Sequence, residues 1–170
     1  MVSCGRMSTL IFGLGNPILS DDAVGLVVAR AVHALVAHLG VEFVEASVAG
    51  LGVLDLIAGH DRVIVVDAIQ TSGGSVGDLY ELSPGDILST PRLASPHDVD
   101  LGLALELGRH FELAMPEEVV IYAVEVADPY TFGEELTPRL AERVPEIVQT
   151  IVDREFGRRS ELPDNKRRSG

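Results

Sequence analysis

Two aspartates and one histidine stand out because each lies at the junction of a strand-like and a helix-like segment. Asp22 comes after the first apolar run of the chain, Asp67 ends an unbroken β-branched run, and His97 precedes a stretch with helical spacing. In a parallel sheet, the connections between strands and helices gather at one edge, where such folds bind ligands. We therefore expect these three side chains to converge. Two carboxylates and one imidazole suit a borderline divalent ion such as nickel or zinc, with coordination positions left open.

Each of these residues also has a purely structural interpretation. Asp21 and Asp22 could cap the following helix, because carboxylates at a helix N-terminus accept its free N–H groups and favour its dipole. Asp67 could cap the turn over residues 68–74, and His97 could simply be a solvated loop histidine. One carboxylate suffices for a helix cap, so the second aspartate of the pair could still project into a crevice.

The sequence argues against several other chemistries. Gly13 and Gly15 lie between a strand and a helix, but the third glycine of the dinucleotide-binding pattern G-x-G-x-x-G is missing. The two aspartates that follow would repel phosphates at the helix N-terminus. The histidines form no H-E-x-x-H pattern, and the chain has no nucleophile elbow. With Cys4 as the only cysteine, neither a cysteine metal cluster nor an internal disulfide can form.

The composition describes a folded, acidic chain. Its 170 residues, 46% of them hydrophobic and 23% charged, suit one domain with a genuine core. A net charge of -13 argues against a nucleic-acid partner, because Lys and Arg carry affinity for phosphate backbones. No stretch approaches about 18 uncharged apolar residues, and no basic segment leads into a long apolar run at the N-terminus. We therefore expect a cytoplasmic protein without a membrane segment.

Alternating strands and helices must position the three residues. Apolar runs predict strands over residues 9–14, 41–46, 62–67, 77–82 and 119–126, and helical spacing predicts helices over residues 23–39, 52–58, 98–111 and from 138 onward. This alternation predicts an α/β three-layer sandwich, with a mostly parallel, about five-stranded central sheet and helices on both faces. Residues 1–153 are expected to form this single domain. Residues 154–170, with six basic and three acidic residues, are expected to form a basic, disordered tail.

The order of these motifs resembles that of the hydrogenase maturation endopeptidases. Residues 13–25 read GLGNPILSDDAVG and are similar to the family's opening G-x-G-N-x-L-x-x-D-[DE]-x-x-G. Then follow VIVVDA at 63–68, SPH at 95–97 and Gly-x-x-Leu-Thr-Pro at 133–138. The resemblance spans about residues 9 to 153. One departure is VEVAD at 124–128, where many members have a Gly-Ile-Glu-Pro-like segment.

The resemblance implies an endopeptidase that removes the C-terminal extension from a nickel-loaded hydrogenase large-subunit precursor. Asp22, Asp67 and His97 match the three family residues attributed to nickel recognition, and they are our expected catalytic and metal-binding residues. The nickel would arrive with the precursor, so no small-molecule cofactor is expected. The metal could polarise the scissile carbonyl or activate a water. A protein carboxylate could instead act as general base.

Two alternatives stay open at this stage. One is a non-catalytic nickel-binding maturation factor that uses the same three residues. The other is a peptidyl-tRNA hydrolase, since that family also begins with a strand and Gly-Leu-Gly-Asn-Pro. That family continues towards a Tyr and a Thr-Arg-His-Asn segment, whereas this chain continues ILSDDAVG, and its acidity disfavours a tRNA substrate.

Overall fold

The computed structural model describes residues 7–47, 52–89 and 98–157. Within them the chain forms a five-stranded sheet in the order β2-β1-β3-β5-β4. The strands are β1 (Thr9–Leu14), β2 (Glu42–Ala46), β3 (Arg62–Ile69), β4 (Leu79–Leu82) and β5 (Glu118–Glu125). All neighbours pair in parallel except β4, which is antiparallel to β5 at the edge. The predicted mostly parallel sheet is confirmed.

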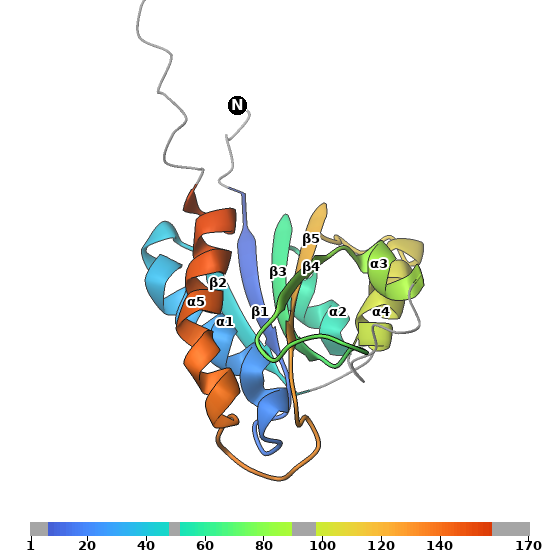
Figure 1. The fold of residues 1–170 in the computed structure, drawn as a ribbon. Helices are drawn as coiled ribbons and strands as arrows, with labels where there is room; N and C mark the ends of the chain where they lie inside the picture. Colours follow the sequence, from blue (N-terminus) through green and yellow to red (C-terminus); the bar gives the residue numbers. More distant parts are fainter. Residues whose placement is uncertain (1–6, 48–51, 90–97, 158–170) are drawn as a thin grey trace, which may run out of the picture.

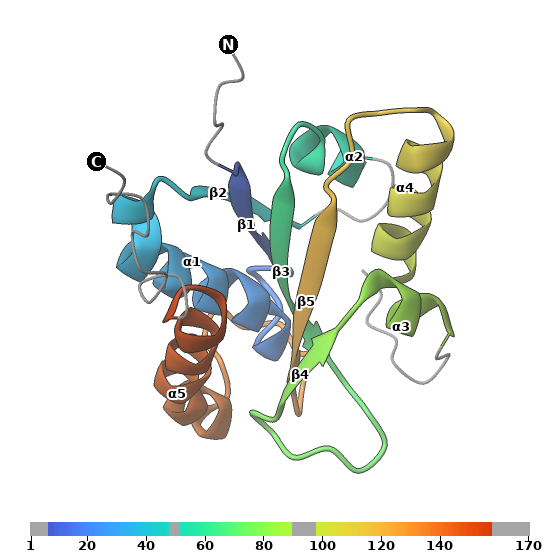
Figure 2. The same cartoon turned by 90° about the horizontal axis from the view of Figure 1, so that it is seen from above.

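Helices cover both faces of this sheet (Figure 1). On one face lie α1 (Val24–Val36) and α5 (Pro138–Glu155), and on the other lie α2 (Gly52–Ile57), α3 (Pro84–Ser89) and α4 (Asp98–His110). Short 3-10 turns, η1 (Asp21–Ala23) and η2 (Ala37–Leu39), flank α1. The view from above shows the same three layers (Figure 2). The predicted α/β sandwich is therefore confirmed.

The two faces of β3 belong to different halves of the core. Ile64 and Val66 pack into the cluster under α1 and α5, whereas Val63 and Val65 pack into the cluster under α2 and α4. Because side chains alternate along a strand, Asp67 shares the face of Val63 and Val65. Its carboxylate therefore emerges in the layer that contains α4, the helix that begins directly after His97 in the chain.

The start of α1 lies directly on the sheet because Gly25 has no side chain. A β-carbon there would lie 2.0 Å from the carbonyl oxygen of Leu14 and 2.6 Å from that of Val66. The same β-carbon would lie 3.1 Å from the α-carbon of Asp67. Only glycine permits this approach, and it brings η1, with Asp22, against the carboxyl ends of β1 and β3.

One helical stretch, Asp21–Leu39, is long and apolar enough to cross a membrane. Its apolar face is part of the core: Val24, Val28 and Val32 are fully buried against the sheet. Packing of this face explains the composition, since a helix at the centre of an α/β domain needs a wide apolar stripe.

The last helix runs two residues past the boundary that the sequence predicted at residue 153. The reason is that Arg154 and Glu155 both have partners on the sheet. Glu155 is buried beside Tyr122 and Arg62, and Arg154 pairs with Glu81 at 3.1 Å. Residues 158–170 lie outside the described part of the chain, so the disordered tail stays a prediction for them.

Candidate active site

Asp67 is a fully buried carboxylate in an otherwise apolar strand. It has no exposed surface, and β3 continues past it to Ile69. Its Oδ1 accepts the N–H of the next residue, Ala68, at 2.8 Å. This hydrogen bond lies within the strand, because β3 continues through Ala68 to Ile69. Burying a carboxylate costs several kcal/mol, on the order of what one core side chain contributes, which marks Asp67 as a candidate functional residue.

Asp22 lies in η1 and is 4% exposed. Its Oδ2 accepts the N–H of Asn16 at 2.7 Å, so the carboxylate supports the Gly-Asn turn that precedes it. Gly15 adopts φ +150° there, and a β-carbon on it would lie 2.2 Å from the carbonyl oxygen of Asp22. Since η1 also contacts β3, the turn, Asp22 and the end of β3 form one compact group at the carboxyl edge of the sheet.

Asp21 has a different role from the one predicted. It makes no cap on α1; its carboxylate instead binds the connection between β5 and α5. Oδ1 accepts the N–H of Thr137 at 2.7 Å, and Oδ2 accepts the N–H groups of Ala127 and Asp128 at 3.3 and 3.1 Å. The Thr137 hydroxyl donates to Oδ2 at 3.1 Å. The helix-cap interpretation of Asp21 is therefore wrong, because those donors satisfy it instead.

A third buried carboxylate, Glu125, lies at the same edge and was not singled out from the sequence. It ends β5, is 3% exposed and shares the sheet face of Asp67 by strand alternation and register. The N–H and hydroxyl of Thr71 donate to its two oxygens, both at 2.8 Å. Through Thr71, Glu125 thus holds the connection that follows β3 at the carboxyl edge of the sheet. The signal that marked Asp67, a carboxylate that ends an apolar strand, was also present here.

His97 lies outside the described residues, so its place relative to the two aspartates stays a prediction. The helix that follows it is described: α4 ends at the amino edge, where Gly59 donates to the carbonyl of Ala114 at 2.8 Å and Glu117 to that of Asp61 at 2.9 Å. The first turn of α4 therefore points towards the carboxyl edge. Within the described part of the chain, no three His, Cys, Asp or Glu side chains are close enough to hold a metal ion.

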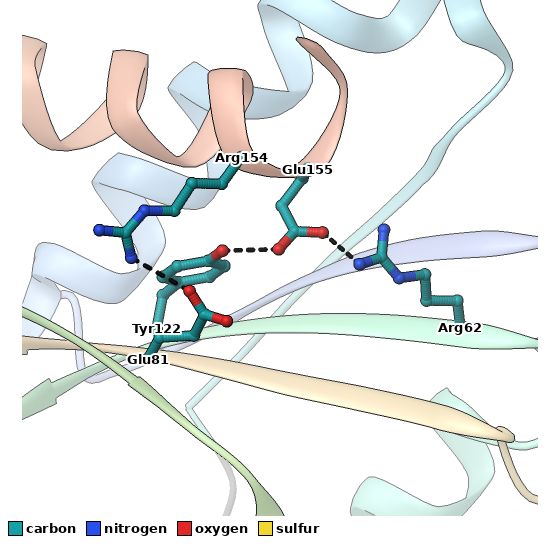
Figure 3. A pocket seen from close by; sticks show the side chains of 5 residues that line it. All are labelled: Arg62, Glu81, Tyr122, Arg154 and Glu155. Carbon is teal, nitrogen blue, oxygen red and sulfur yellow. Dashed lines mark hydrogen bonds and ion pairs between the residues drawn. The ribbon is translucent and has the colours of Figure 1, made fainter. Parts of the chain in front are cut away.

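A second group of charges lies away from this edge, around a pocket of about 370 Å³ between α5 and the sheet (Figure 3). The Tyr122 hydroxyl donates to Glu155 at 2.5 Å, and Arg62 pairs with both Glu155 and Glu118. Burial, and then the hydrogen bond to Glu155, raise the pKa of Tyr122 above its usual range. Because these charges pair with one another between α5 and the sheet, we assign the group to the docking of α5 rather than to catalysis.

Comparisons with known proteins agree with one another. A model of the hydrogenase maturation protease family matches residues 27–154, a range that contains Asp67 and His97. The hydrogenase 2 maturation protease of Escherichia coli (strain K12) is 26% identical over 151 residues, covering 86% of this chain and 89% of that protein.

Solved structures show the same fold. The hydrogenase maturating endopeptidase HybD from E. coli superposes with a TM-score of 0.71 at 24% identity, covering 91% of this chain and 94% of that one. The [NiFe] hydrogenase maturation protease HybD from Thermococcus kodakarensis superposes with a TM-score of 0.65 at 22% identity, covering 85% of this chain and 96% of that one.

Proposed function

Because this chain belongs to the hydrogenase maturation protease family, we propose that it hydrolyses one peptide bond near the C-terminus of a hydrogenase large-subunit precursor and releases the extension. The family makes the chain a hydrolase that acts as an endopeptidase. That assignment argues against both alternatives drawn from the sequence, the non-catalytic nickel-binding factor and the peptidyl-tRNA hydrolase.

In this proposal nickel is part of the substrate. The metal bound in the precursor is recognised by Asp22, Asp67 and His97, and this recognition places the scissile bond. What supports it best is the close packing at Gly25, three residues after Asp22, where a β-carbon would lie 3.1 Å from the α-carbon of Asp67. Carboxylates and imidazole are ligands that nickel accepts.

The chemistry requires a water to attack the scissile carbonyl and a proton to reach the leaving amine. Substrate nickel can act as a Lewis acid on that carbonyl or on the water, whereas a carboxylate of this chain can take the water's proton as general base. In both routes Asp67 must hold its position, because misplacement by about 1 Å can cost about a hundredfold in rate. Its burial within β3 and its hydrogen bond to Ala68 provide that rigidity.

The test replaces Asp67 by asparagine, which keeps the size of the side chain but weakens metal ligation. We expect the wild type to cut a nickel-loaded precursor and to leave a nickel-free one intact, with the mass of the released peptide as the readout. Asp67→Asn and His97→Ala should each lower the cleavage rate at least a hundredfold, on the order of the loss of a transition-state contact. Asp61→Asn, an exposed aspartate at the amino edge, is the matched control and should cleave like the wild type.

Two results would contradict the proposal. If the nickel-free precursor is cut as fast as the loaded one, nickel is not recognised. If Asp67→Asn and His97→Ala both keep wild-type rates while remaining folded, these residues do not form the site.

A further inference from the structure

Beside the candidate site, two neighbouring segments expose large apolar side chains. Tyr130 and Phe132 are 68% and 79% exposed, although both lie in a connection that is hydrogen-bonded to the rest of the domain. Phe132 lies directly opposite the half-buried Leu19 in an antiparallel bridge. The N–H of Ser20 donates to the carbonyl of Thr131, at 3.0 Å, on one side of this bridge. We call Leu19, Tyr130 and Phe132 the apolar patch.

The apolar patch is held in place by hydrogen bonds. Asp128 Oδ1 accepts the N–H groups of Tyr130 and Thr131 at 3.2 and 2.9 Å, and the Ser20 hydroxyl donates to the carbonyl of Glu135 at 3.0 Å. Behind them, Asp21 binds both ends of the same connection. A large aromatic side chain that is exposed on a fixed backbone loses little further freedom on binding, which favours a docking role.

The apolar patch is continuous with the candidate active site. Asp22 accepts the N–H of Asn16, and the Asn16 side chain in turn accepts the N–H of Ile18 at 3.2 Å. Leu19 is the next residue, so two hydrogen bonds connect the carboxylate to the apolar patch. Figure 1 shows the connection between β5 and α5, in orange, below the segment that leads into α1. The apolar patch therefore lies next to the turn that Asp22 supports.

The negative charge around the apolar patch indicates which partner charge would be complementary to it. Glu134 and Glu135 are both exposed on the same connection, and the whole chain carries a net charge of -13. An apolar surface with an acidic rim complements an apolar segment flanked by Lys or Arg, and it repels an acidic one.

We propose that Leu19, Tyr130 and Phe132 are the docking surface for the precursor, and that they bind an apolar segment of it flanked by basic residues. The inference rests on the proposed function for the identity of the partner. Docking here would hold the precursor while its metal engages the carboxylates, so the apolar patch should govern affinity rather than the chemical step.

The experiment compares Phe132→Ser and Tyr130→Ser with a matched control, Phe111→Ser. Phe111 is 64% exposed and follows α4 at the opposite, amino edge. Cleavage of nickel-loaded precursor is expected to show KM raised at least about tenfold in each apolar-patch variant, the order of loss for an exposed aromatic anchor. We expect kcat within about twofold of wild type, since only ground-state binding is lost. The control should match the wild type, and thermal unfolding should confirm that all three variants fold.

Direct binding of the nickel-free precursor separates this inference from the proposed function. If the wild type cleaves and Phe132→Ser binds as tightly as wild type, the docking surface is wrong and the protease assignment stands. If the wild type cuts neither precursor but binds it, and Phe132→Ser loses that binding, the docking surface stands and the proposed function is wrong. A wild-type dimer that Phe132→Ser dissociates in sedimentation would make a second copy the occupant and overturn the proposal.

The acidic rim is tested separately with the double variant Glu134→Gln and Glu135→Gln. It should weaken precursor binding about threefold at low ionic strength and match the wild type at about 0.5 M salt, where exposed charges are screened. Unchanged binding at low salt would overturn the basic flank assigned to the partner.

Discussion

Replacing Asp21 by alanine tests whether one carboxylate holds the β5–α5 connection against the start of α1. The side chain is fully buried and accepts hydrogen bonds from three backbone N–H groups, of Ala127, Asp128 and Thr137, and from one hydroxyl. A donor left without an acceptor costs about 1–3 kcal/mol when buried. The donors are only partly buried and share one acceptor, so the losses do not add fully, and we expect about 3–5 kcal/mol in all.

Asparagine at the same position should cost somewhat less, about 2–4 kcal/mol. Its single acceptor oxygen can serve either Thr137 or the pair formed by Ala127 and Asp128, and its amide then faces the other donors. Against a total stability of about 5–15 kcal/mol for a domain of this size, both changes are large.

The measurement is urea unfolding at pH 7, read by midpoint and slope. Asp55→Asn, an exposed aspartate in α2, is the control and should change stability by no more than about 0.5 kcal/mol. Hydrogen exchange gives a local readout, because the amides of Ala127 and Thr137 should lose protection first. If Asp21→Ala lies within about 1 kcal/mol of wild type with an unchanged slope, the carboxylate does not hold the connection.

Two further predictions concern the docking of α5. The pKa of Tyr122 is raised above the usual tyrosine value of about 10. The neutral phenol therefore contributes stability that is complete below about pH 10 and is lost as the pH rises further. Tyr122→Phe should flatten the decline in the free energy of unfolding above about pH 10, as measured by urea unfolding. A chain that ends at residue 153 lacks Glu155, which pairs with Arg62, and Phe156, which packs into the core. It should be less stable than one that ends at 157 by about 3–5 kcal/mol, and equal stability of the two would refute the docking of this segment.

The fold was largely predictable because its strongest signals are local. The unbroken run at residues 62–67 predicted a strand, and its β-branched residues are typical of a strand covered on both faces; β3 is indeed buried along its whole length. The run at residues 77–82 also predicted a strand, and β4 lies there, at the edge of the sheet. Local apolar spacing carries this information, since it reflects which faces of each element are covered.

The different hydrogen-bond partners of the two adjacent aspartates, Asp21 and Asp22, were not predictable. Asp22 accepts a hydrogen bond from Asn16, six residues before it in the chain, whereas Asp21 accepts one from Thr137, 116 residues after it. Nothing in a single sequence indicates a hydrogen bond across that separation, so a local cap was the natural interpretation of Asp21. Glu125 was missed for a similar reason, since its partner Thr71 lies 54 residues away.

The order of the strands has a consequence during synthesis on the ribosome. β5 is the last strand to be made, yet it lies between β3 and β4 inside the sheet. Until residues 118–125 emerge, the apolar β3 has an unpaired edge of the kind that templates aggregation, and Asp21 lacks its donors at 127, 128 and 137. A nascent chain stalled before residue 118 should therefore be cut readily by an added protease around Asp21. The carboxyl edge that carries Asp22 is therefore completed only when residues from the last third of the chain are available.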